Sequence, residues 1–344
     1  MKPSLPTGPG DNIGRTISRR RFFHQTGAAA LSTMLLTSCD NLLDKVFPSK
    51  KDKRDKTLAF FGDSLTNGTG GTRPFGEWVG NTLTGRPLYH DAINGQISSS
   101  IATRQGGLPL TVSVAGRKFD GLEPVAVTKL NNQFLSTFLN GNIYTRTGTL
   151  AGVKCTIKRT FVQGLGDQYS VQPLAASEAE LKPDIEIPDD SVFELEDAAK
   201  MRTATQILWY GRNDITESKP ERDILEAIKS SVAYIAEPRR FLVLGILLAI
   251  PENKGTARYA KITAFNDELA LLYRDSYVSM APPTQAEMEA IGYTPTAEDL
   301  ANIEAGNFPA GMRPANKSDQ IHLNDFGYKI VANRVAAKIK DLDY

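Results

Sequence analysis

Ser64 is the first residue whose type and position suggest chemistry. It follows the apolar residues 57–61, a predicted buried strand, in the turn Gly62-Asp63-Ser64-Leu65. A serine on the turn after a strand is held clear of the sheet. There it can attack an ester carbonyl if a base and donors for the oxyanion lie close by. Gly-Asp-Ser triplets are also common in ordinary turns, so this segment alone leaves both interpretations open.

Such a serine needs a base, and elimination among the histidines narrows the choice. Outside the first 40 residues the chain has only two histidines, His90 and His322. His90 falls in a predicted strand over residues 87–93 and is expected to be a structural or surface histidine. His322 stands just before a predicted C-terminal helix, with Asp319 three residues earlier. This spacing lets Asp319 accept from one ring nitrogen and leaves the other nitrogen for the proton of Ser64.

Four segments, in this order, resemble the sequence blocks of the SGNH (GDSL-type) serine hydrolases. The first two are the turn around Ser64 and residues 94–100, Asn-Gly-Gln-Ile-Ser-Ser-Ser, which follow the strand over 87–93. The third is Gly-Arg-Asn-Asp over residues 211–214, after the apolar residues 207–210. The last is the Asp-x-x-His of residues 319–322. Each segment is weak evidence alone, but their succession after predicted strands is specific.

The resemblance implies an oxyanion hole built from three donors. These are the backbone N–H of Gly95, the side-chain amide of Asn213 and the N–H of Ser64 itself. Many relatives have Gly-x-Thr or Gly-x-x-Ser in the second block. This chain has Gly-Gln-Ile-Ser over residues 95–98, so its alignment to that block is fixed only to within a residue or so. Taken alone, Asn94-Gly95 is an ordinary turn dipeptide, and the third block would serve as a loop with a helix cap.

The resemblance also implies the fold and the reaction. The expected fold is a three-layer α/β/α sandwich with a mainly parallel, flavodoxin-like sheet, formed by residues 57–107 and 200–344. The expected reaction is ester hydrolysis through an acyl-Ser64 intermediate, with no metal and no organic cofactor. Short, acetyl-type acyl groups are expected, on a small molecule or on a polysaccharide or envelope glycan. Two alternatives stay open: an O-acyltransferase with the same triad, and a glycan-binding surface lipoprotein.

The first 56 residues predict export and a membrane anchor. Ser-Arg-Arg-Arg-Phe-Phe over residues 18–23 resembles a twin-arginine signal, and a short apolar run leads to Leu-Thr-Ser-Cys, which resembles a lipobox. We expect residues 1–38 to be removed as an export signal, Cys39 to carry a lipid, and residues 39–56 to form a tether. The expected location is the periplasmic face of the inner membrane or the cell surface. The alternative is a basic tail followed by an ordinary buried cysteine.

Residues 108–199 separate the second block from the third and predict a β-rich insertion. Apolar residues alternate with period two and glycines recur between them, which favours a small antiparallel β unit. Residues 181–196 are acidic and carry prolines, so we expect an exposed return segment. The role of the insertion stays open between gripping the substrate, passive decoration and a contact surface.

Composition excludes some partners and sites. Residues 1–38 hold five of the 40 basic and one of the 39 acidic residues, which leaves the remainder at a net charge of −3. This balance gives no reason to expect nucleic acid as a partner. If Cys39 is lipidated, Cys155 has no disulfide partner and is expected to be a small buried side chain. The few histidines make a metal site unexpected, and the oligomeric state is not predicted.

The remaining segments complete the expected sandwich. Residues 221–236 and 257–273 have helical periodicity, residues 284–306 are expected to form a helical covering, and residues 325–342 an amphipathic helix. Residues 241–250 are continuously apolar and are predicted to form a central strand.

Overall fold

The computed structural model describes residues 54–138, 143–175 and 185–344. The predicted export signal, Cys39 and nearly all of the predicted tether lie outside the described residues. Within those ranges, no helix combines the length and the apolar composition needed to span a bilayer.

The central sheet consists of parallel strands in a doubly wound order. Its strands are β1 (Leu58–Gly62), β2 (Leu88–Ala92), β9 (Thr205–Trp209), β10 (Phe241–Leu244) and β11 (Tyr277–Val278). They lie in the order β11-β10-β9-β1-β2, and every neighbouring pair is parallel. Counted along the chain within this sheet, the order is 2-1-3-4-5, the flavodoxin-like arrangement. In such sheets the strand order reverses between the first and third strands, here β1 and β9, and their carboxyl ends open a crevice there.

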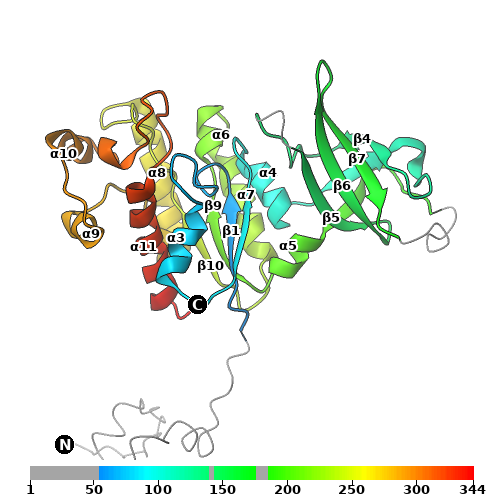
Figure 1. Ribbon diagram of the computed structural model, residues 1–344, viewed down its shortest axis with the longest axis horizontal. Helices are drawn as coiled ribbons and strands as arrows, with labels where there is room; N and C mark the ends of the chain where they lie inside the picture. Colours follow the sequence, from blue (N-terminus) through cyan, green and yellow to red (C-terminus); the bar gives the residue numbers. More distant parts are fainter. Residues whose placement is uncertain (1–53, 139–142, 176–184) are drawn as a thin grey trace, which may run out of the picture. The chain divides into compact units, whose positions relative to one another are not determined.

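Helices cover both faces of this sheet (Figure 1). One face packs against α3 (Phe75–Thr82) and α11 (Asp325–Asp341), and the other against α4 (Ser98–Gln105), α7 (Glu221–Tyr234) and α8 (Ala257–Tyr273). Successive strand residues point to opposite faces, so Phe60 packs in the first layer and Phe61 in the second, both with no exposed surface. The predicted three-layer α/β/α fold is confirmed.

The shorter helices join these elements or cover their ends. They are α5 (Glu196–Met201), α6 (Arg212–Thr216), α9 (Gln285–Ala290) and α10 (Ala297–Glu304), with 3₁₀ turns η1 (Ala115–Arg117), η3 (Arg274–Ser276) and η4 (Ala310–Met312). The helices expected over residues 221–236, 257–273 and 325–342 are confirmed within two residues at each end, and α9 and α10 form the covering expected over residues 284–306.

The predicted antiparallel β insertion is confirmed, and its strands close into a barrel. They are β3 (Thr111–Val114), β4 (Val125–Leu130), β5 (Tyr144–Leu150), β6 (Val153–Val162), β7 (Gly166–Pro173) and β8 (Ser191–Leu195), in the order β3-β4-β7-β6-β5-β8. Closure follows because β8 pairs with both β3 and β5, which leaves no open edge. Cys155 lies inside this barrel with no exposed surface, and burial raises the pKa of its thiol to about 12. The domain bounds 57–107, 108–199 and 200–344 stay a prediction.

The expected central strand over residues 241–250 is wrong in length. β10 ends at Leu244, although it is an interior strand of the sheet, between β9 and β11. Residues after Leu244 stay buried because side chains replace the strand ladder. Asn266 bonds both the N–H and the C=O of Ile246, at 2.7 and 3.0 Å. Arg212 and Arg313 donate to the next two carbonyls, at 2.9 and 2.7 Å.

The segment expected to be an exposed return over residues 181–196 alternates between exposed and buried residues where the structure describes it. Residues 191–195 form β8, and Phe193 and Ile187 are buried in the barrel. The acidic and polar residues of this segment lie between the buried ones, because alternate side chains of a barrel strand face outward.

Candidate active site

Ser64 lies at the carboxyl end of β1, beside the point where the strand order reverses. The turn that carries it is fixed by backbone bonds, from Asn67 N–H to the Asp63 carbonyl at 3.0 Å and from Thr69 N–H to the Ser64 carbonyl at 3.0 Å. A Cβ on Gly62 would lie 2.0 Å from the Thr66 hydroxyl and 2.8 Å from a backbone oxygen of β9. Only glycine therefore allows the turn to begin this close to its neighbours.

The structure brings Ser64, His322 and Asp319 together in one hydrogen-bonded line. Ser64 Oγ lies 2.7 Å from Nε2 of His322. The other ring nitrogen, Nδ1, lies 2.8 and 2.9 Å from the two carboxylate oxygens of Asp319. Nδ1 can therefore donate to the carboxylate, which leaves Nε2 as an acceptor for the serine proton.

Asp319 is held as a carboxylate. Burial alone would raise the pKa of this group, but hydrogen bonds from the His322 backbone N–H, the His322 ring and the Ile321 N–H outweigh it. The pKa of Asp319 is therefore lowered from its ordinary value. The two backbone bonds measure 3.1 and 3.2 Å and fix the carboxylate independently of the ring. Asp319 thus remains ionised at neutral pH, as a group that orients and stabilises an imidazolium must.

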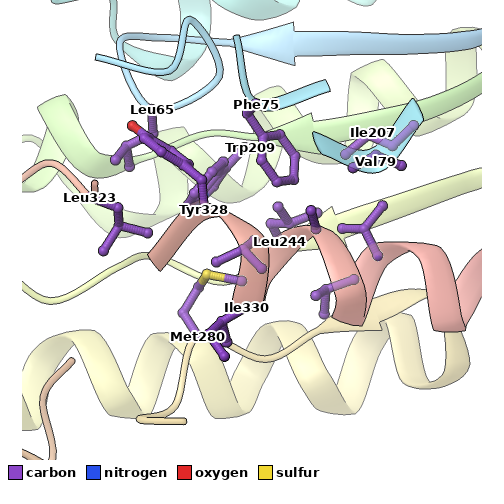
Figure 2. Close-up of a cluster of buried hydrophobic side chains, with 14 of the residues drawn as sticks. Leu65, Phe75, Val79, Ile207, Trp209, Leu244, Met280, Leu323, Tyr328 and Ile330 are labelled. Carbon is purple, nitrogen blue, oxygen red and sulfur yellow. The ribbon is translucent and has the colours of Figure 1, made fainter. Parts of the chain in front are cut away.

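The nucleophile and the base are positioned by one apolar cluster (Figure 2). Leu65, which follows Ser64, and Leu323, which follows His322, both pack in this cluster with no exposed surface. Tyr328, also labelled in Figure 2, belongs to the same cluster, and its hydroxyl donates to the Thr69 carbonyl at 2.8 Å, so α11 is bonded directly to the turn after β1. Because close-packed interiors resist deformation, this packing fixes the distance between two residues that are 258 positions apart in the chain.

The predicted oxyanion donors lie on the turns that follow the neighbouring strands. Gly95 follows β2 and has a φ of +82°, a conformation that favours glycine. Among the described residues, neither its N–H nor that of Ser64 donates to a protein acceptor. Both N–H groups thus have no protein acceptor among the described residues, and their role as oxyanion donors stays a prediction.

Asn213 follows β9, and its amide nitrogen already has two acceptors. It donates to a carboxylate oxygen of Asp63 at 3.0 Å and to the Gln96 carbonyl at 2.9 Å. An oxyanion would therefore have to take the place of one of these acceptors.

Asp63 is a buried group at the site to which the sequence analysis assigned no role. Besides Asn213 it accepts the Leu65 N–H at 2.9 Å, so it links the turn of the nucleophile to the donor amide. Burial, with Asp214 nearby, raises the pKa of the Asp63 carboxyl to about 7, against the lowering effects of the Leu65 N–H and two arginines. Its position directly before Ser64 is the feature of the sequence that could have identified it as part of the site.

Gln96 and Arg104 form a second unpredicted part of the site. Arg104, with no exposed surface, donates to the Gln96 side-chain oxygen at 2.8 Å and to the Gly62 carbonyl at 2.9 Å. It also pairs with the buried carboxylate of Asp91, which is shared with Arg146 of β5 at 2.8 Å. The ends of β1 and β2, the turn that carries Gly95 and the barrel are thus joined by one network.

His90 does not belong to this constellation. It lies on β2, where its ring stacks against Phe60 with centroids 5.3 Å apart, and burial lowers the pKa of its imidazole. This placement agrees with the expectation of a structural or surface histidine.

No protein-family model matches the chain, and no curated protein matches it. Several solved structures match the chain. A candidate acylhydrolase from Bacteroides fragilis is 14% identical over 87% of this chain and 93% of its own, with a TM-score of 0.41. A GDSL-like lipase from Bacteroides thetaiotaomicron is 12% identical over 84% and 89%, at a TM-score of 0.41. The esterase EstA from a Pseudoalteromonas species is 10% identical over 84% and 100%, at a TM-score of 0.39.

Proposed function

We propose that the chain is a serine ester hydrolase in which Ser64 forms an acyl intermediate. The observation that carries this proposal is the line from Ser64 Oγ through the His322 ring to Asp319, with contacts of 2.7 and 2.8 Å. A serine, an oriented base and free backbone donors at one crevice meet the geometric requirements of acyl transfer.

In the first half-reaction, Ser64 Oγ attacks the ester carbonyl carbon while Nε2 of His322 takes the hydroxyl proton. The carbonyl oxygen becomes an oxyanion, which accepts from the N–H groups of Gly95 and Ser64 and from the amide of Asn213. The tetrahedral intermediate then collapses. The bond to the alcohol oxygen breaks, the leaving alcohol takes the proton from His322, and the acyl group stays on Ser64.

In the second half-reaction, water takes the place of the alcohol. His322 removes a proton from the water, whose oxygen attacks the acyl carbon, and the same donors hold the second oxyanion. Collapse releases the carboxylic acid, and His322 returns the proton to Ser64 Oγ. Asp319 stays ionised throughout and stabilises the imidazolium in both halves.

We further propose that the substrate carries a short, acetyl-type acyl group on a polar alcohol such as a glycan hydroxyl. The support comes from the sequence, whose N-terminal signals predict an exported, anchored enzyme that would meet envelope or environmental glycans.

The proposed location is outside the cytoplasm, on a lipid anchor at Cys39. The support is the order of the N-terminal signals in the sequence. Labelled fatty acid should be incorporated into the protein expressed in a bacterium with lipoprotein processing, and not into a Cys39→Ser variant. Equal labelling of both proteins would contradict the anchor.

The hydrolase proposal is tested with p-nitrophenyl esters from acetyl to palmitoyl. The parent protein should release p-nitrophenol fastest from the acetyl or butyryl ester. The variants Ser64→Ala and His322→Ala should release none from any of the esters. His90→Ala is the matched control for loss of a histidine and should remain active. Turnover only when a sugar acceptor is added would indicate acyl transfer. Binding of glycan without turnover of any ester would support the glycan-binding alternative.

A further inference from the structure

One segment of the barrel, residues 134–138 between β4 and β5, docks onto the turn that carries Gly95. The Gln96 side-chain amide donates to two carbonyls of this segment, those of Phe134 at 2.6 Å and Ser136 at 3.0 Å. In return, the Thr137 hydroxyl donates to the Asn94 carbonyl at 3.0 Å. The residues on both sides of Gly95 are therefore bonded to the barrel.

The same segment is fixed from the barrel side by buried groups. The Phe134 ring has no exposed surface and stacks on Tyr169 of β7, with centroids 6.2 Å apart. The Ser136 hydroxyl bonds the Asp167 carboxylate and lies 3.2 Å from the Tyr169 hydroxyl. Arg159, fully buried, donates to Asp167 at 2.8 Å. The segment thus belongs to the packed barrel and holds a defined position at the oxyanion turn.

Phe138 ends this segment with its ring against Gly95. A Cβ on Gly95 would lie 2.6 and 2.8 Å from two carbons of the Phe138 ring. The ring is nevertheless 67% exposed, whereas Phe134 four residues earlier is buried. An exposed aromatic ring held against the glycine that donates to the oxyanion is within reach of a substrate bound there.

The position of Phe138 relative to the base determines which part of the ester it meets. The loop before His322 is bonded to the segment after β10, through Ile250 N–H and the Gln320 carbonyl at 2.9 Å, so it lies on the β9–β10 side of Ser64. Gly95 follows β2, on the other side of β1. The alcohol oxygen must face His322 to receive its proton, so the oxyanion and the acyl chain take the remaining directions, and Gly95 and Phe138 lie on that side.

We propose that Phe138 is a specificity-determining residue that forms the wall of the acyl site and limits the chain to short acyl groups. This inference rests on the proposed function and gives the insertion a role in selecting the substrate. The ring occupies the space beside Gly95 that further methylenes of a longer chain would need, and added methylenes in a defined apolar site change rates by tenfold or more.

The test is the ratio of kcat/KM for acetyl and octanoyl p-nitrophenyl esters. Phe138→Ala should lower this ratio about tenfold or more by admitting the longer chain, and Phe138→Trp should raise it. Leu165→Ala is the matched control, since Leu165 lies in the turn between β6 and β7, is 72% exposed and should leave the ratio unchanged. A phosphonate that labels Ser64 should react with every variant.

The outcomes separate this inference from the proposed function. An active parent whose ratio is the same in Phe138→Ala would overturn the role of Phe138 alone. So would an equal fall in kcat/KM for both esters, because that result means that the ring only positions Gly95. A parent that neither turns over an ester nor reacts with the phosphonate would overturn the proposed function and this inference with it.

Discussion

Asp319→Asn is the substitution that most directly tests the carboxylate beside the His322 ring. The asparagine keeps the shape of the side chain, and its carbonyl oxygen can still accept the Ile321 and His322 backbone N–H groups, which lie 3.2 and 3.1 Å from Oδ1. Its NH₂ group takes the place of Oδ2 beside Nδ1 and cannot accept a hydrogen bond, so it favours the ring tautomer that has its proton on Nε2, and the negative charge beside the ring is lost as well. That charge stabilises the imidazolium, which exists only after Ser64 has given up its proton.

The size of the loss follows from the geometry. Nδ1 and the carboxylate oxygens are 2.8 and 2.9 Å apart, and both side chains are about one-fifth exposed. Opposite charges with centres about 4 Å apart interact by about 4 kcal/mol at the effective dielectric constant of a site near the protein surface. Since about 1.4 kcal/mol is a factor of ten, kcat should fall roughly 10³-fold, with little change in KM.

The assay is steady-state hydrolysis of p-nitrophenyl acetate, with a thermal melt to confirm folding. Asp325→Asn is the matched control, since this nearby carboxylate bonds the Thr72 N–H and hydroxyl, both at 2.8 Å, and should leave kcat within a few-fold of the parent. A folded Asp319→Asn protein with kcat within tenfold of the parent would refute the assigned role of the charge.

Three further predictions concern groups around the triad. Asn213→Ala should lower kcat about 10²–10³-fold on the same ester, as expected for one oxyanion donor, and an unchanged kcat would exclude that role. Tyr328→Phe leaves the Thr69 carbonyl without its partner, which should lower the free energy of unfolding by about 1–3 kcal/mol in urea melts; an equal stability would mean that this bond does not fix the turn. Because the pKa of Asp63 is raised from 3.8 to about 7, the folded state binds a proton that the unfolded state releases between these values. Stability should therefore fall as pH rises from about 4 to 7, and melts of Asp63→Asn, which cannot titrate, should lack this contribution; identical pH profiles would contradict it.

The sequence predicts the position of the central residues because the topology of a parallel sheet is regular. Apolar runs that end at Gly62 and Tyr210 read as buried strands, and the carboxyl ends of neighbouring parallel strands meet at one edge. Ser64 and Asn213 therefore had to come close together once both strands joined the same sheet. The three-residue spacing of Asp319 and His322 likewise fixes a local contact that needs no knowledge of the fold.

The parts that escape prediction depend on long-range contacts without a local pattern. Gln96 looks like a departure from a motif, and only the folded chain shows it bonded to Arg104 and to a barrel segment about 40 residues away. The position of Phe138 against Gly95 likewise depends on the registers of the barrel strands. β8 pairs with β3, some 80 residues away along the chain. Acidic residues stand beside the buried side chains of β8, so the sequence of this segment looks like that of an exposed one.

The most direct test of the account is whether an acyl group is transferred to Ser64. Rapid acid quench of the protein with p-nitrophenyl acetate, followed by intact-mass and peptide analysis, would detect the intermediate. An acyl-Ser64 mechanism predicts a mass increase of one acetyl group, located on Ser64, which appears with the burst of p-nitrophenol, disappears as ester is exhausted, and is absent from Ser64→Ala. Turnover without a covalent adduct, or an acetyl group on another residue, would contradict it.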